Sequence, residues 1–136
     1  MKRRPKSYKS LEIYQLALEL AVEIHRISLS DLPKFEMYEE GGQIRRSSKS
    51  VVSNIVEGYG RKYYKNEFVK FLTYALASCD ETKAHLEMLD KTESLSKPFF
   101  DAVYDRYKEL GAKLFKFRQT VIQKHNIFDD DTEETP

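Results

Sequence analysis

Residues 43–61 read QIRRSSKSVVSNIVEGYGR, a stretch that combines apolar side chains, basic side chains and closing glycines. At about 100° per residue, apolar positions spaced three or four apart from Ile44 to Tyr59 fall on one face of a helix. Glycine destabilises a helix interior, so the glycines on either side mark the ends of this helix. We therefore predict a helix over residues 42–57, with basic side chains beside its apolar face.

Three further helices are predicted around this one. The segment after Ser10, which we expect to be the N-cap, is apolar over most of its circumference as far as Ile27. Two later segments, separated by Pro98, repeat apolar residues in steps of four and three, which is the spacing of a helical-bundle seam. The first seam contains Phe68, Leu72, Ala75, Cys79, Thr82, Leu86 and Leu89, and the second contains Phe100, Val103, Tyr107, Leu110, Leu114, Phe117 and Val121.

These four helices, joined by short or medium connections, predict an all-α fold, an antiparallel up-and-down four-helix bundle. We expect the bundle to span residues 11–128, after a flexible basic arm at residues 1–10 and before an acidic, disordered tail at residues 129–136. In the connection that contains Pro33, Phe35 is expected to pack against the bundle.

Apolar residues outside the seams favour self-association. The first helix has surplus apolar surface, and the fourth carries Phe99, Tyr104, Phe115 and Ile122 away from its seam. A monomer would expose a larger apolar patch than is usual, and assembly would cover it. We therefore expect a homo-oligomer.

The composition excludes several classes of protein. Cys79 is the only cysteine, so a single chain has no disulfide and no cysteine-based metal cluster, which fits a reducing cytoplasm. No apolar run is long enough for a secretion signal or a membrane span, so we expect a cytoplasmic protein without a membrane partner. The three histidines, His25, His85 and His125, lack metal-ligand spacing, and we expect no metal site and no cofactor.

The net charge of +1 conceals a strong segregation of charge along the chain. Residues 1–10 carry five bases and no acid, and residues 45–70 carry seven bases and two acids. Residues 11–44 carry seven acids and two bases, while residues 129–136 carry five acids and no base. The total charge does not favour bulk nucleic-acid binding, but the local basic run permits an anionic partner, for which the tail can compete.

Around its basic and apolar residues, the central stretch carries an ordered set of polar and glycine positions, Gln43, Asn54, Glu57 and Gly58. Together with a matching run at residues 68–72, this order resembles the signature of the 23S rRNA intervening-sequence protein family, which consists of small bacterial four-helix-bundle proteins. Two features depart from the family pattern. Ser47 and Ser48 stand where the family usually has alanines, and Ala77 stands where glycine is common.

The resemblance implies more about assembly than about activity. The family is named for genes that lie inside spacers of ribosomal RNA genes, and that location is not a biochemical activity. Relatives, including the accessory proteins of diversity-generating retroelements, are similar in size and form pentameric barrels. The resemblance therefore implies a homopentamer, with a protein such as a reverse transcriptase as a candidate partner.

The basic residues of the central stretch are candidate contacts for the phosphates of RNA or DNA. Tyr59, Tyr63 and Tyr64 lie among them and could stack on unpaired bases. The alternative interpretation is a solvated face with ion pairs, for example between Arg46 and Glu57. The candidate nucleic-acid contacts are Arg45, Arg46, Lys49, Arg61 and Lys62.

Other motif residues have structural or catalytic interpretations. Asn54 and Glu57 are expected to tie adjacent helices or subunits together, and Gly58 is expected to stop the helix. Arg118 and His125 are seven residues apart and therefore share a helix face if the helix continues between them. Their spacing resembles the motif of the helical HEPN ribonucleases, in which the histidine would act as a general acid or base.

Three functions therefore remain open. We favour a non-enzymatic, oligomeric binding or scaffold module that contacts structured RNA or a ribonucleoprotein through the basic helix face. The alternative is a protein-binding scaffold with no nucleic-acid contact. The remote alternative is a helical ribonuclease that uses Arg118 and His125.

Overall fold

The structure, a computed structural model, describes residues 7–125. The basic side chains at positions 2–6 and the predicted acidic tail at 129–136 lie outside the described residues. The described residues form helices and no strand. The helices are η1 (Tyr8–Ser10), α1 (Glu12–Ser30), η2 (Lys34–Glu36), α2 (Glu40–Gly60), α3 (Lys65–Lys91) and α4 (Lys97–Gln123).

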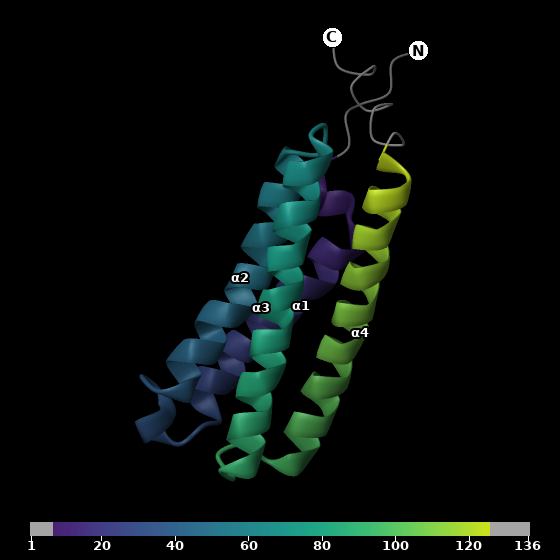
Figure 1. Ribbon diagram of the computed structural model, residues 1–136. Coiled ribbons are helices and arrows are strands. Elements are labelled where there is room, and N and C mark those ends of the chain that lie inside the picture. The colour runs from purple at the N-terminus through teal and green to yellow at the C-terminus, as the bar shows by residue number, and fades with distance from the viewer. Residues whose placement is uncertain (1–6, 126–136) are drawn as a thin grey trace.

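The four long helices run up and down in turn, so the predicted antiparallel four-helix bundle is confirmed (Figure 1). The turn between α2 and α3 lies at the same end of the bundle as the start of α1 and the end of α4, and the other two connections lie at the opposite end (Figure 1). Helix α2 packs closely on both α1 and α3, whereas α1 and α4 share the smallest of the four neighbouring contacts. The homo-oligomer stays a prediction.

Apolar side chains from all four helices meet in one core, and the predicted seams supply much of it. All seven residues predicted for the α3 seam are buried. In α4, five of the seven predicted residues are buried, while Phe100 and Phe117 are half-buried and pack against the core. Steps of four and three therefore identified the inner faces of α3 and α4 from the sequence.

The start of α1 differs from the prediction. The N-cap of α1 is Leu11 and makes no side-chain capping bond, so the prediction that Ser10 caps this helix is wrong. The Ser10 hydroxyl instead donates to the carbonyl oxygen of Ser7 within η1, at 2.8 Å. The Tyr8 ring of η1 packs edge-on against Tyr14 of α1, with 4.9 Å between ring centroids. Part of the predicted basic arm is thus helical and packed on the bundle.

Helix α2 is longer than predicted at both ends, because glycines continue it instead of ending it. A Cβ built on Gly41 would stand 2.5 Å from the carbonyl oxygen of Glu36, and one on Gly58 would stand 3.1 Å from Cβ of Phe71. Gly41 therefore needs a residue without a side chain, because a backbone atom lies too close, while at Gly58 an added Cβ would fit only if Phe71 shifted by a few tenths of an ångström. The prediction that Gly58 stops the helix is wrong.

The bundle leaves apolar side chains on its outside, as predicted for α1 and α4. Leu18 and Val22 of α1 are 42% and 43% exposed, and Phe115 of α4 is 54% exposed. Phe35, which was expected to pack down, is 70% exposed instead, so that prediction is wrong. Within residues 7–125, no helix combines the length and hydrophobicity needed to cross a membrane.

Candidate nucleic-acid interface

Arg46 and Lys49 project from the exposed side of α2, turned away from the buried Ile44 and Ile55. Neither side chain has an ion-pair partner among residues 7–125. Arg46 makes one long contact, in which Nη1 donates to Oε1 of Gln43 at 3.4 Å on the same helix. These two cations are therefore free to meet an anionic partner from solvent.

Arg45 instead ties the start of α2 to the rest of the bundle. Its Nη1 donates to Oγ of Ser28 in α1 at 2.9 Å, and its Nη2 donates to the carbonyl oxygen of Met37 at 2.6 Å. The guanidinium thus binds a hydroxyl near the end of α1 and a backbone carbonyl in the connection that follows α1. A partner could reach Arg45 only by competing with these internal bonds.

Arg61 is held by two carboxylates across the turn between α2 and α3. Its guanidinium donates to Oε2 of Glu57 at 2.9 Å and to Oε1 of Glu67 at 3.0 Å, and it lies over the Phe71 ring. The hydrogen bond that the guanidinium donates to Glu57 is the main cause that raises the pKa of Arg61. Glu57 therefore pairs with Arg61, and the ion pair suggested between Glu57 and Arg46 is not formed.

Lys62 is buried, with only 8% of its surface exposed. Its ammonium lies 4.2 Å from the ring centroid of Tyr59 and 5.2 Å from that of Tyr63, which are cation–π distances. Tyr59 is itself buried and so cannot stack on a base, whereas Tyr63 and Tyr64 are exposed. Of the five candidate contacts, only Arg46 and Lys49 remain exposed and without an ion pair within the described chain.

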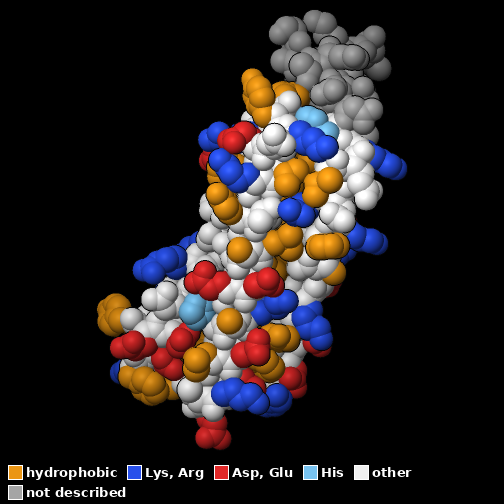
Figure 2. Space-filling view, in the orientation of Figure 1, with side chains coloured by type: hydrophobic (Ala, Val, Ile, Leu, Met, Phe, Trp, Pro, Cys, Tyr) orange, Lys and Arg blue, Asp and Glu red, His pale blue; other side chains and the backbone are white. Residues whose placement is uncertain are grey.

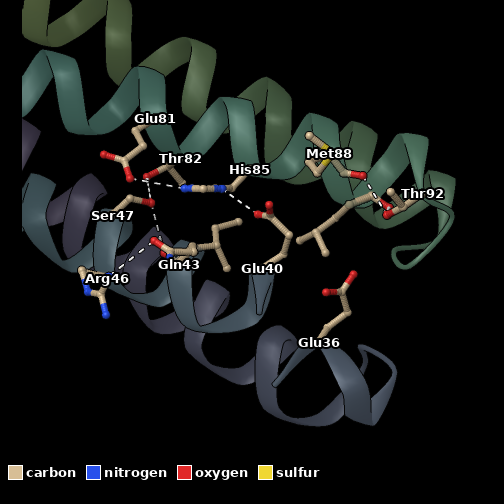
Figure 3. A network of polar contacts seen from close by, with 12 residues as sticks. Glu36, Glu40, Gln43, Arg46, Ser47, Glu81, Thr82, His85, Met88 and Thr92 are labelled. Carbon is tan, nitrogen blue, oxygen red and sulfur yellow. Dashed lines mark hydrogen bonds and ion pairs between the residues drawn. The ribbon is translucent and has the colours of Figure 1, made fainter. Parts of the chain in front are cut away.

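Beside Arg46, α2 and α3 are joined by a row of hydrogen-bonded side chains (Figure 3). His85 of α3 lies between two carboxylates, with Nδ1 2.6 Å from Oε2 of Glu40 and Nε2 3.3 Å from Oε2 of Glu81. The doubly protonated imidazolium can donate to both carboxylates at once, whereas the neutral ring donates to one. The sequence analysis missed this cluster, because Glu40 is 45 residues away from His85.

Further along this row the contacts are between small hydroxyl side chains. Thr82 donates to Oγ of Ser47 at 2.8 Å, and the hydroxyls of Ser50 and Ser78 are 2.9 Å apart. Asn54 donates to the carbonyl oxygen and the hydroxyl of Ser50, at 3.0 and 3.1 Å. Both bonds of Asn54 lie within α2, and the Ser50 hydroxyl that it contacts is the one that meets Ser78 of α3. The role predicted for Asn54 between helices or subunits stays a prediction.

On the other side of α2, a groove of about 470 Å³ opens between α1 and α2 and is called the α1–α2 groove here. Its floor is apolar, and Arg26 and Lys49 are the charged residues that line it. Its volume is within the range of small binding sites. The groove is lined by Leu18, Ala21, Val22, His25, Arg26, Lys49, Val52 and Ser53.

The residues that could support catalysis or metal binding are placed elsewhere. Helix α4 ends at Gln123, so His125 lies beyond it and the helix face expected to join Arg118 and His125 is not formed. Arg118 donates to Oγ1 of Thr73 at 2.8 Å, and His125 Nε2 lies 2.7 Å from the carbonyl oxygen of Lys62. No group of three or more metal-ligating side chains occurs within residues 7–125.

The Cys79 thiol is unreactive at neutral pH because it is buried. The thiol is fully buried in the α3 seam, and burial raises its pKa to about 11. The thiolate is the reactive form of cysteine, so at neutral pH this side chain acts as a small apolar residue.

Comparisons with known proteins agree with this fold. A family model described as 23S rRNA-intervening sequence protein matches residues 9–116. A crystal structure from Bacteroides thetaiotaomicron, of a protein with unknown function from the S23 ribosomal protein family, is 25% identical and superimposes with a TM-score of 0.73. That alignment covers 79% of this chain and 96% of the other. No curated protein matches the sequence.

Proposed function

The chain belongs to the 23S rRNA-intervening sequence protein family, and from that premise we propose that it is a non-enzymatic, oligomeric module that binds structured RNA or a ribonucleoprotein. The contact surface in this proposal is the exposed side of α2. The observation that supports it most is the state of Arg46 and Lys49, which are exposed and unpaired while Arg45, Arg61 and Lys62 have internal partners.

Two cations in a chain of net charge +1 make only a modest patch. Phosphate contacts add up, because each neutralised phosphate releases counterions. An oligomer would repeat Arg46 and Lys49 once per copy and would build a larger basic surface from a nearly neutral chain. The homopentamer implied by the resemblance is therefore part of the proposal, and the uncovered apolar surfaces of α1 and α4 support it.

The test replaces Arg46 and Lys49, which are unpaired, and leaves unchanged the three basic residues that have internal partners. For the double variant Arg46→Gln/Lys49→Gln, we expect the affinity for a fluorescent structured RNA at low salt to fall at least about tenfold, as for two lost charge-assisted hydrogen bonds. The slope of log affinity against log salt should also become shallower by about two for each copy that contacts the RNA, one for each lost phosphate contact. Fluorescence anisotropy titrations at several salt concentrations measure both quantities.

Lys91→Gln/Lys108→Gln is the matched control, because it removes the same charge from exposed positions on α3 and α4. This control should retain the affinity and the salt slope of the parent. An unchanged affinity and slope in the Arg46→Gln/Lys49→Gln variant would show that the exposed side of α2 is not the contact surface. An equal loss in both variants would show that overall charge, and not this surface, governs binding.

A second candidate function, a protein-binding scaffold, is favoured by one different observation. Phe35 and Tyr38, in the connection between α1 and α2, are 70% and 89% exposed, and exposed aromatic side chains are enriched at protein interfaces. Co-purification from nuclease-treated cells discriminates between the two functions. A protein retained by the parent and lost from a Phe35→Ser/Tyr38→Ser variant would favour the scaffold, whereas a partner lost on nuclease treatment would favour the nucleic-acid module.

A further inference from the structure

The floor of the α1–α2 groove is formed by apolar side chains from two helices. Leu18, Ala21 and Val22 of α1 line it, together with Val52 of α2. Leu18 and Val22 are exposed, so the described residues leave much of this floor open to solvent. Covering exposed apolar side chains with an apolar molecule is favourable. The floor can therefore hold the apolar part of a ligand.

The two cations of the groove lie towards one end of it. Arg45 of α2 donates to Ser28 of α1, and this bond fixes how the two antiparallel helices stand side by side. Lys49 lies about one turn along α2 from Arg45, and Arg26 lies less than one turn before Ser28 on α1. Leu18 lies eight residues before Arg26, about 12 Å away along the helix axis. The groove thus has a cationic end and an apolar end.

The cations at this end have no acid to pair with among the described residues. Neither Arg26 nor Lys49 makes an ion pair within residues 7–125, and no acid lines the groove. Glu19 and Glu23, the two acids that most closely precede Arg26 in α1, are held instead by Arg106 of α4, at 2.9 and 3.9 Å. An anion from solvent could therefore bind Arg26 and Lys49 without displacing an acid of the chain.

Exposed apolar side chains on the opposite part of the bundle have different surroundings. On the face where α3 lies in front, side chains of both charges stand among the hydrophobic ones (Figure 2). Lys83 lies 3.4 Å from Asp80, and Lys97 lies 3.5 Å from Asp90. These lysines are already paired within the chain. The α1–α2 groove differs, because its apolar floor ends at cations that are unpaired within the described chain.

We propose that the α1–α2 groove binds a small amphipathic anion, a medium-chain carboxylate. Its apolar chain lies on Leu18, Val22 and Val52, and its carboxylate lies between Arg26 and Lys49. A guanidinium can donate two parallel N–H bonds to a carboxylate, and a volume of about 470 Å³ is that of a small-molecule site. Lys49 also belongs to the proposed nucleic-acid contact, whereas Arg26 does not. The ligand covers the apolar surface of α1 and leaves that of α4 to the proposed oligomer.

The test measures the binding of decanoate to the unmodified protein by isothermal titration calorimetry, below the concentration at which decanoate forms micelles. We expect saturable binding of one decanoate per chain. Decanol has the same apolar chain without the charge, and acetate has the charge without the chain. Each should bind at least about tenfold more weakly than decanoate, because each lacks one part of the contact.

Two variants separate the two ends of the site. Val22→Asp places a negative charge on the apolar floor and should abolish decanoate binding. Arg26→Gln removes one contact to the carboxylate and should weaken binding at least about tenfold. Met88→Asp and Lys108→Gln are the matched controls, because they make the same changes at exposed positions of α3 and α4 and should bind decanoate like the parent. Unchanged circular dichroism of each variant confirms that it is folded.

Three results would overturn the proposed site. The first is the absence of saturable decanoate binding, and the second is binding that Val22→Asp and Arg26→Gln leave as tight as in the parent. The third is decanol binding as tightly as decanoate, because the cations would then contribute nothing. Light scattering identifies the competing occupant. If the parent does not bind decanoate and its mass falls in the Val22→Asp variant, a second copy of the chain covers the groove instead of an anion.

Discussion

At the scale of single residues, Gly41 lies where the connection from α1 crosses the start of α2. A Cβ there would stand 2.5 Å from the carbonyl oxygen of Glu36, a backbone atom that cannot move aside cheaply. Gly60, at the other end of α2, has nothing within 4 Å of such a Cβ. We expect Gly41→Ala to lower the free energy of unfolding by about 1–3 kcal/mol through overpacking. Gly60→Ala should raise it by up to about 1 kcal/mol through helix propensity.

Urea denaturation of the two variants and the parent measures both changes. Gly42→Ala is the matched control, because its Cβ would meet only an ordinary contact, 3.6 Å from the carbonyl oxygen of Met37. It should be neutral or stabilising. If Gly41→Ala were as stable as Gly42→Ala, the close approach of the connection to α2 would not be a real constraint on the chain.

At the candidate site, the sequence predicted which basic side chains lie together on α2, but not which of them have partners elsewhere in the fold. Spacing on α2 identified the basic cluster, and Arg46 and Lys49 are exposed as a solvated face requires. Spacing could not show that Arg45 would meet Ser28 and Met37, or that Lys62 would be buried. These partners come from other elements, and only the packing of α1, α2 and the turn between α2 and α3 brings them together.

At the scale of whole helices, the periodic pattern predicted the inner faces well and the ends poorly. The seam from Phe68 to Leu89 is buried along its length because steps of four and three depend only on local geometry. Helix ends depend on tertiary packing as well. Close approach of the Glu36 backbone at Gly41 and of the Phe71 side chain at Gly58 favoured glycine inside α2. At Lys124 the backbone leaves the helix, with φ −134° and ψ 45°, before His125 is reached.

The contact between α2 and α3 also explains one departure from the family pattern. The resemblance described above leads us to expect alanine at position 47, and here the Ser47 hydroxyl accepts a hydrogen bond from Thr82 at 2.8 Å. A buried hydroxyl is costly unless it is hydrogen-bonded, and this one is paired. The serine therefore keeps the small size that close helix packing needs while adding a polar contact between the two helices.

At the scale of the whole molecule, the proposed oligomer would let a nearly neutral chain bind an anionic partner by repeating the exposed cations of each copy. One copy offers two free cations on α2, and an assembly offers them once per copy at fixed spacing. Linking several weak contacts raises the overall affinity without any new contact, provided that one nucleic acid can reach several copies together. In the proposed oligomer, the repeated cations would make binding more sensitive to salt than one copy would be.

The measurement that tests this claim most directly is the binding of the purified, unmodified protein to a fluorescent structured RNA and to duplex DNA of similar length. Each titration is made at low and at near-physiological salt. We predict binding at low salt whose affinity falls steeply with salt, with a log–log slope larger than about two because several copies contribute phosphate contacts. No binding to either nucleic acid at low salt, or an affinity that salt leaves unchanged, would contradict the account and leave the protein scaffold as the better description.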